Sequence, residues 1–267
     1  MGILNVTPDS FSDGGSYLAL EAAVLRAREM TRAGASFIDV GGESTRPGAL
    51  SVPVETELQR VIPVIEALHA QRLKEGSEVL ISIDTRKAEV ARCALAAGAD
   101  LVNDVSGLQD QEMRQVCASF GVPAVLMHMP ATPEEMGWSQ SSGVFTDIVA
   151  EVSKALSQLA VQALADGVPS VILDPGFGFG KSIQQNFELI RGLDEIRSLG
   201  HAVMLGASRK SSLSRIAGAG SPEALVPASL AAHLYGFQRG ADILRVHDVE
   251  AHIQAIRIWK YLEQKDS

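Results

Sequence analysis

Cysteine is scarce in this chain of 267 residues, which contains only Cys93 and Cys117 and no CxxC motif. Both cysteines fall in predicted helices, so we interpret them as buried free thiols of a reducing compartment and not as a disulfide framework. The six histidines do not occur at the spacings that bind zinc. A nucleophile elbow of the GxSxG type is also missing. These absences argue against a disulfide-stapled scaffold, a zinc site and an elbow-type serine nucleophile.

Long apolar runs and basic clusters are missing too. No apolar stretch reaches the about 18 residues of a membrane-spanning helix, and no basic-then-apolar segment resembles a signal peptide. Val6 stands where N-myristoylation requires serine or threonine. The formal charge is −9, from 23 basic and 32 acidic residues, and no basic block stands out. We therefore expect a cytoplasmic protein that binds neither nucleic acid nor a membrane.

What the sequence does contain is a regular alternation of short β-rich runs and longer helical patterns. The strand candidates are Ile3–Val6, Phe37–Val40, Leu80–Ile83, Leu101–Asn103, Ala124–Met127, Val171–Leu173, Val203–Leu205 and Ile243–Val246. The helical patterns include Leu20–Thr31, Val54–Ala70, Lys87–Ala97, Ile148–Ala165, Phe187–Leu199, Ala224–Gln238 and Ala251–Glu263. Eight strands, each followed by a helix, give the count of a (β/α)8 TIM barrel.

The apolar strands favour a parallel sheet that is buried on both faces. No low-complexity linker divides the chain, so we expect one α/β barrel domain over residues 1–267. A doubly wound open sheet is the alternative, since a strand count does not prove closure. Two connections are long for a βα junction, Thr7–Leu18 and Gly41–Pro53, and we interpret them as lids over the barrel mouth.

Polar residues stand at the carboxyl end of every predicted strand, where barrel enzymes build their active sites. They are Asn5, Asp39, Asp84, Asn103, Asp104, His128, Asp174, Ser208, Arg209, Lys210, Arg245 and His247. For Asp39, Asp104 and His128, a helix cap or a turn is as good an interpretation as a functional role. His69, His201, His233 and His252 fall in helices or at helix ends, and we interpret them as structural.

The stretch from Asp174 to Lys181, DPGFGFGK, is the most informative of these strand ends. It places a carboxylate beside Phe177 and Phe179 in a glycine-rich turn, which suits a planar heterocycle with several N–H donors. Its spacing fits neither a P-loop nor a dinucleotide fingerprint. The adjacent cations Arg209 and Lys210 precede a predicted helix, where the macrodipole disfavours cations, so they indicate an anion site. The run from Arg245 to Asp248 repeats the arrangement after the last strand.

Seven segments together resemble dihydropteroate synthases, in that family's order. They are Met1–Gly15 (MGILNVTPDSFSDGG), Gly42–Ala49 (GESTRPGA), Ile83–Arg86 (IDTR), Val102–Gly107 (VNDVSG), Asp174–Lys181 (DPGFGFGK), Ser208–Ser211 (SRKS) and Arg245–Val249 (RVHDV). The resemblance implies an enzyme that condenses 6-hydroxymethyl-7,8-dihydropterin diphosphate with p-aminobenzoate in folate biosynthesis. It also implies that the enzyme uses a magnesium cofactor, forms a homodimer and is a target of sulfonamides.

The resemblance assigns roles to individual residues. The pterin is expected to contact Asp84, Asn103, Met127, Asp174 and Lys210. The p-aminobenzoate is expected near Thr45, Arg46, Pro47, Phe179 and Ser208. Asn5, Arg46, Arg245 and His247 are the expected pyrophosphate site, with Asn5 also the magnesium ligand. Lys210, Arg245, His247 and Asn5 are the expected catalytic residues.

Two features depart from the family pattern. The hairpin that precedes the family's first strand is expected to be absent, since the sequence starts at that strand. After the fifth strand the sequence reads Met129-Pro130-Ala131, where the family usually has glycine. Two alternatives remain: a pterin-dependent methyltransferase, which would not need the FSDGG, STRPGA and SRK segments, and a non-catalytic pterin-binding homologue. A class I aldolase with Lys210 as the Schiff-base lysine is weaker.

Overall fold

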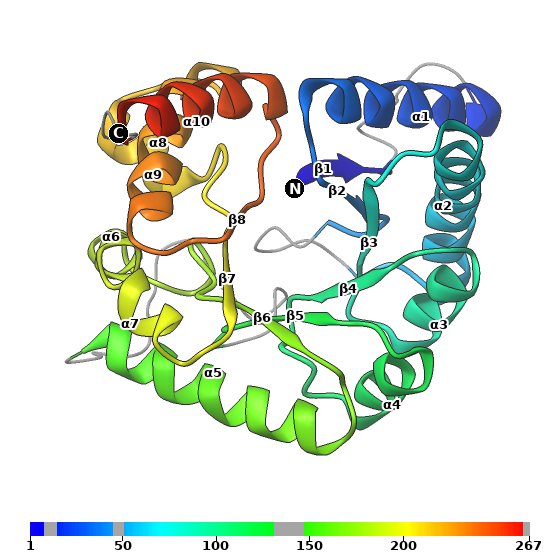
Figure 1. The fold of residues 1–267 in the computed structure, drawn as a ribbon, viewed down its shortest axis with the longest axis horizontal. Coiled ribbons are helices and arrows are strands. Elements are labelled where there is room, and N and C mark those ends of the chain that lie inside the picture. The colour runs from blue at the N-terminus through cyan, green and yellow to red at the C-terminus, as the bar shows by residue number, and fades with distance from the viewer. Residues whose placement is uncertain (8–14, 45–50, 131–146, 264–267) are drawn as a thin grey trace.

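The computed structural model describes residues 1–7, 15–44, 51–130 and 147–263 (Figure 1). Eight parallel strands form one sheet in sequence order: β1 (Gly2–Asn5), β2 (Phe37–Gly41), β3 (Leu80–Asp84), β4 (Leu101–Asp104), β5 (Ala124–Met127), β6 (Val171–Asp174), β7 (Ala202–Leu205) and β8 (Ile243–Leu244). A parallel bridge between Gly2 and Val246 joins the first strand to the segment after the last. The Ile3 amide donates to the Val246 carbonyl at 2.9 Å, and the Val246 amide donates to the Met1 carbonyl at 2.9 Å.

These bonds close the sheet into a barrel. The prediction of a (β/α)8 barrel is therefore confirmed, and the open doubly wound sheet is excluded. Closure also places the carboxyl ends of all strands around one mouth.

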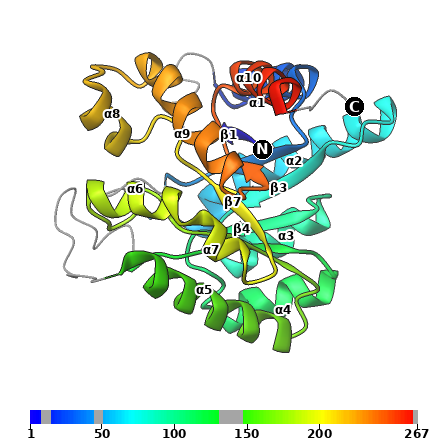
Figure 2. The same ribbon diagram turned by 60° about the vertical axis from the view of Figure 1, so that its left-hand side comes forward.

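Helices surround the barrel on the outside (Figure 2). They are α1 (Gly15–Ala33), α2 (Val54–Glu75), α3 (Ala88–Ala96), α4 (Gln111–Phe120), α5 (Ile148–Ala165), α6 (Ile183–Arg191), α7 (Leu193–Arg197), α8 (Ser211–Ala217), α9 (Val226–Gln238) and α10 (Val249–Glu263), with a 3-10 turn η2 (Glu223–Leu225) before α9. Within the described ranges no helix is long and apolar enough to cross a membrane.

The strand positions from the sequence agree with the structure to within about two residues, but one helix prediction does not. The predicted helix Phe187–Leu199 is two helices, α6 and α7, which meet at Gly192. A Cβ at Gly192 would lie 2.7 Å from Val149 of α5. The helices α4 and α8 lie where the sequence predicts helices around Cys117 and after Lys210, although it gave no bounds for either.

Alternation along the strands separates the barrel interior from the helix-facing side. A small cluster of Leu101, Val125 and Met204, with Ile172 and Ile243 packed against it, is separate from the main core. Side chains two residues apart on a strand share a face. Asn103, Met127, Asp174 and Arg245 lie two residues beyond four members of this cluster, on the same faces of their strands. The barrel interior is therefore apolar in its middle, where this cluster lies, and polar at the mouth, where the strands end.

Candidate active site

Arg245, just after β8, lies between two carboxylates at the mouth of the barrel. Its Nε donates to Asp39 Oδ2 at 2.6 Å, and its terminal nitrogen donates to Asp84 Oδ2 at 2.6 Å. Asn103 Nδ2 donates to the same Asp39 oxygen at 3.0 Å. Asp39, Asp84 and Asn103 are all buried. The three strands β2, β3 and β4 thus supply a connected polar floor that one guanidinium holds together.

This floor carries one cation for two carboxylates. Burial raises the pKa of Asp84 to about 7, with Arg245 opposing the shift. Although burial opposes it, Asp39 and Asp84 raise the pKa of the Arg245 guanidinium. In the part of the chain that the structure describes, Asp39 Oδ1 and Asp84 Oδ1 are buried without a hydrogen-bond partner. Buried acceptors with spare capacity and surplus negative charge suit a ligand that presents N–H donors.

Asp174 ends β6 beside this floor and is buried. Its Oδ1 accepts from the Gly176 amide at 2.7 Å, and burial raises its pKa. Gly176 has φ of +70°, and a Cβ there would lie 2.0 Å from the His128 carbonyl oxygen. Glycine is therefore required at this turn, which holds the carboxylate at the mouth.

Lys181 fixes the rest of the glycine-rich turn. Its Nζ donates to the carbonyl oxygens of Gly176 at 2.9 Å, His128 at 3.1 Å and Phe179 at 3.1 Å. Burial lowers the pKa of Lys181 to about 7. The sequence placed this lysine in the motif but gave it no role. The available indication was the position of this cation at the end of a glycine-rich turn, because the backbone carbonyls of such a turn need hydrogen-bond donors.

Lys210 extends from the turn after β7 toward the same glycine-rich segment. Its Nζ donates to the Phe177 carbonyl and lies 4.4 Å from the centre of the Phe179 ring. A Cβ at Gly178 would lie 2.8 Å from Lys210 Cδ. Burial lowers the pKa of Lys210 to about 8, and Asp174 opposes the shift. Lys210, Phe179 and Asp174 therefore meet at one side of the mouth.

Ser208 and His247 join the turn after β7 to the segment after β8. Ser208 Oγ accepts from the His247 amide at 3.2 Å and lies 3.0 Å from His247 Nδ1. Arg209 makes two bonds to the Asp248 carboxylate, at 2.6 and 3.0 Å. The anion that the adjacent cations required is thus, for Arg209, a carboxylate of the protein itself.

The remaining predicted positions divide into four groups. Asn5 is half-buried at the end of β1, opposite Gly41, and Met127 is buried at the end of β5, opposite Asp174. Asp104 serves the turn-forming role, since its carboxylate accepts from the amides of Ser106 and Leu108. His128 Nδ1 is buried, and burial lowers the pKa of this histidine to about 4. Thr45, Arg46 and Pro47 lie outside the described residues, as do residues 8–14 and 45–50 of the two predicted lids.

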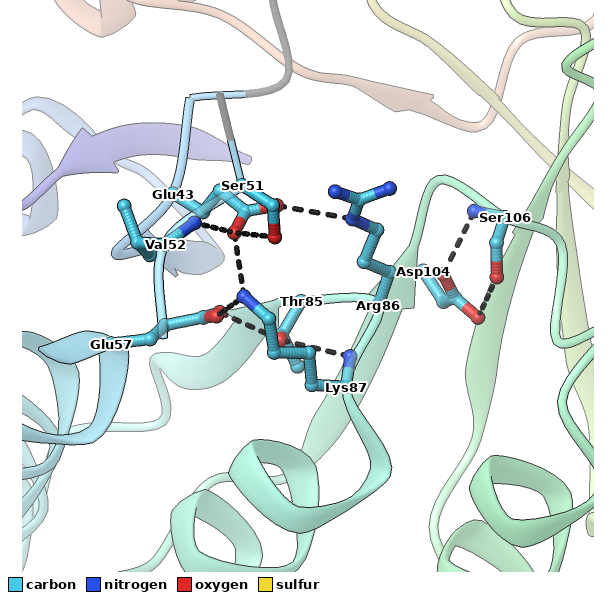
Figure 3. A network of polar contacts seen from close by, with 9 residues as sticks. All are labelled: Glu43, Ser51, Val52, Glu57, Thr85, Arg86, Lys87, Asp104 and Ser106. Carbon is cyan, nitrogen blue, oxygen red and sulfur yellow. Dashed lines mark hydrogen bonds and ion pairs between the residues drawn. The ribbon is translucent and has the colours of Figure 1, made fainter. Parts of the chain in front are cut away.

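Sequence reasoning missed an ion-pair network around Glu43, just after β2 (Figure 3). The Glu43 carboxylate accepts from Lys87 Nζ, from Arg86 Nε at 3.0 Å and from the Val52 amide at 2.9 Å. Lys87 also pairs with Glu57. Glu43 and Lys87 stand inside or beside the GESTRPGA and IDTR motifs, which was the only indication of this contact.

Asn5 is the one predicted magnesium ligand, and the surrounding chemistry can be compared with what that ion requires. Among the described residues no group of three or more histidine, cysteine, aspartate or glutamate side chains could hold a metal ion. Mg²⁺ commonly takes one or two protein oxygens and completes its shell with water and substrate phosphates. An amide oxygen at the barrel mouth fits that mode, in which a diphosphate supplies the main ligands.

A closed barrel of parallel strands with a buried polar mouth defines the class of protein: a (β/α)8-barrel enzyme. The sequence model of the pterin binding enzyme family matches residues 1–247. The chain belongs to this family, and the relatives that it matches along most of their length include dihydropteroate synthases of Streptococcus pyogenes and Escherichia coli.

Three relatives illustrate the match. Dihydropteroate synthase of Escherichia coli K12 is 44% identical over 97% of this chain and 89% of its own length. Solved structures of the Xanthomonas albilineans dihydropteroate synthase, one with 4-aminobenzoic acid and one with 7,8-dihydropteroate, are 45% and 42% identical, with TM-scores of 0.91 and 0.87. They cover 100% of this chain, which in turn covers 93% and 94% of theirs. A probable bifunctional folylpolyglutamate synthase/dihydropteroate synthase of Haloferax volcanii is 45% identical, and the chain spans 30% of its length.

Proposed function

We propose that the protein condenses 6-hydroxymethyl-7,8-dihydropterin diphosphate with p-aminobenzoate, giving 7,8-dihydropteroate and pyrophosphate. Proteins named dihydropteroate synthase match this chain along almost their whole length. This match confirms the prediction of a dihydropteroate synthase. The observation that carries the proposal for this chain is the buried floor at the mouth, where the Arg245 guanidinium bonds to Asp39 and Asp84 and Asn103 bonds to Asp39.

The pterin is proposed to lie against the carboxylates at the mouth. A pterin edge alternates N–H donors with ring nitrogens and a carbonyl. Asp84 Oδ1 and the Asp174 carboxylate offer acceptors, the Asn103 amide offers both a donor and an acceptor, and the Met127 side chain supplies an apolar contact. The Lys210 ammonium is proposed to reach the pterin carbonyl.

The p-aminobenzoate is proposed to bind on the Phe179 side of Lys210. The Phe179 ring centre lies 4.4 Å from Lys210 Nζ, and Ser208 stands two residues before that lysine in the same turn. Thr45, Arg46 and Pro47 remain proposed contacts from the resemblance alone. Lys210 is therefore assigned to both substrates, since it lies between the pterin floor and the aromatic side.

The diphosphate is proposed to leave past Asn5, Arg46, Arg245 and His247. As the bond between the exocyclic methylene carbon and the diphosphate oxygen breaks, the negative charge on that oxygen grows, and cationic groups stabilise it. Bound Mg²⁺, held by Asn5 and the diphosphate, would neutralise phosphate charge. The electron-rich pterin bears the resulting cation, and the amine attacks the methylene carbon and then loses a proton. No strong base is needed for an aniline near neutral pH.

We expect the purified protein to release pyrophosphate only when both the pterin diphosphate and p-aminobenzoate are present, and to lose this activity with excess EDTA. Added magnesium should restore the rate. A coupled assay for pyrophosphate with separate detection of dihydropteroate measures both. Lys210→Met, which removes an ammonium between the two substrates, serves as the matched inactive variant. Pterin binding without any dihydropteroate formation would instead establish the non-catalytic homologue.

We also propose a homodimer, as the resemblance implies. The last helix, α10, exposes Ile258, Tyr261 and Leu262 at 64, 74 and 74% of their surface. An apolar end on a surface helix suits contact with a second copy of the chain. Analytical ultracentrifugation should give twice the mass of 28.3 kDa, and Tyr261→Lys should shift it toward the monomer. A single species of monomeric mass at micromolar concentration would contradict the proposal.

A cytoplasmic location is the companion proposal. Cys93 and Cys117 are free thiols in the structure, the second of them buried, which supports a reducing compartment. Cell fractionation with an antibody to the protein tests it, and recovery in an oxidising compartment would contradict it.

A further inference from the structure

A line of hydrogen bonds runs from the mouth of the barrel through two buried histidines. The Ala207 amide donates to His233 Nε2 at 3.0 Å. His233 Nδ1 lies 2.8 Å from His252 Nε2, and His252 Nδ1 lies 2.7 Å from the Asp248 carbonyl oxygen. The two histidines are 0 and 3% exposed. The line therefore begins and ends on backbone groups that flank Ser208 and His247.

The two ends of this line fix the proton positions on both rings. The Ala207 amide can only donate, so His233 Nε2 is an acceptor and the proton of that ring is on Nδ1. That N–H donates to His252 Nε2, which places the proton of the second ring on Nδ1, facing the Asp248 carbonyl. One additional proton on either ring would set two donors against each other. The pair is thus satisfied only when both rings are neutral.

The neighbours of the pair support this neutral state. Burial lowers the pKa of His233 well below its usual value, and His252, Lys210, the N-terminal amine and His247 act in the same direction. Burial also lowers the pKa of His252, against the Asp248 carboxylate. Most groups that face the pair from other elements are therefore cationic or basic.

Helix α9, which carries His233, also contacts the turn after β7 through a second residue, Ser229. Ser229 Oγ accepts from the Arg209 amide at 3.0 Å, and Ser229 lies one helical turn before His233 on α9. Arg209 has φ of +57°, a left-handed conformation that is unfavourable for a side chain with a Cβ. The Arg209 guanidinium is clamped by Asp248. Two acceptors on α9 and one carboxylate thus maintain a strained turn that includes Ser208 and Lys210.

We propose that His233 and His252 are positioning residues, a neutral pair of fixed tautomers that holds the Ala207–Lys210 turn against the His247–Asp248 segment. Through this turn the pair sets where Ser208, Lys210 and His247 meet the two substrates, so the proposal rests on the proposed function. The sequence alone had indicated only structural histidines, because the contact between them joins two helices, α9 and α10.

Kinetic measurements on two substitutions at His233 test the role. His233→Phe removes both hydrogen bonds, and we expect KM for both substrates to rise by roughly 10- to 100-fold, as for lost buried hydrogen bonds. His233→Gln can place an amide oxygen near the Nε2 position, keep the Ala207 contact and recover most of that loss. His201→Gln, at the opposite end of β7, is the control and should match the native enzyme. Unchanged KM values in His233→Phe, or equal losses in the Phe and Gln variants, would overturn the proposal.

A spectroscopic test is independent of activity and of folding defects in the variants. In native protein labelled with ¹⁵N-histidine, both rings should show protonated Nδ1 and unprotonated Nε2 at neutral pH, with assignment from His233→Gln and His252→Gln. A charged ring or an Nε2–H tautomer at either position would overturn the fixed pair. If the native protein lacks synthase activity but shows these tautomers, the proposed function fails while the hydrogen-bond line stands.

Discussion

Replacing Asp174 with alanine should abolish measurable pterin binding. The carboxylate is buried at the mouth, and without it the pterin N–H donors would lose their acceptor, at a cost of roughly 1–3 kcal/mol for each buried donor. Alanine would also remove the acceptor of the Gly176 amide, which donates to Asp174 Oδ1 at 2.7 Å in the native protein. A loss of pterin affinity in Asp174→Ala therefore has two causes, the missing contact with the ligand and the missing hydrogen bond that supports the turn.

Asp174→Asn separates these two contributions. An asparagine oxygen can still accept from the Gly176 amide, but its NH₂ group then presents a donor to the pterin where an acceptor is needed. We expect this variant to keep the native unfolding temperature and still fail to bind. Isothermal titration calorimetry with a pterin ligand measures the affinity, and Asp242→Asn, at the opposite end of the barrel, is the control. Near-native affinity in Asp174→Ala would disprove the assignment.

Replacing Arg245 with leucine should destabilise the fold by about 3–5 kcal/mol near pH 8, because Asp39 and Asp84 would remain buried without their cation. The cost should shrink as the pH falls. Burial already raises the pKa of Asp84 to about 7 in the native protein, and losing Arg245 removes its main opposing influence. A carboxyl group with a raised folded pKa favours folding at low pH, and this benefit is lost as the pH rises through that pKa.

Urea unfolding at pH 5.5 and pH 8 measures the effect of Arg245→Leu. Adding Asp84→Asn to the variant should recover part of the stability at pH 8, because it removes one uncompensated charge. Arg239→Leu, at an exposed position on the surface, is the control and should change stability by less than about 0.5 kcal/mol. A variant that is equally stable at both pH values, or less stable at the lower one, contradicts the charge argument.

The barrel and the rim of polar residues were accessible from the sequence, because both depend on local patterns. Short apolar runs alternate with helical periodicity, and parallel strands joined in sequence order bring all their carboxyl ends to one mouth. The period of two along a strand then places Asn103 above Leu101 and Asp174 above Ile172 on the interior face. The family resemblance, carried by motifs at these strand ends, was confirmed by the match of the pterin binding enzyme family model to residues 1–247. The roles of the individual site residues and of magnesium stay predictions.

Pairing between side chains was decided by the tertiary structure alone. Arg245 pairs with Asp39, 206 residues away, and Arg209 pairs with Asp248. His233 finds both of its partners on other elements, the Ala207 amide after β7 and His252 on α10. Such contacts depend on which rotamers fit a packed, closed barrel and on how burial changes the energy of a charge. The local periodicity of a sequence contains information on neither.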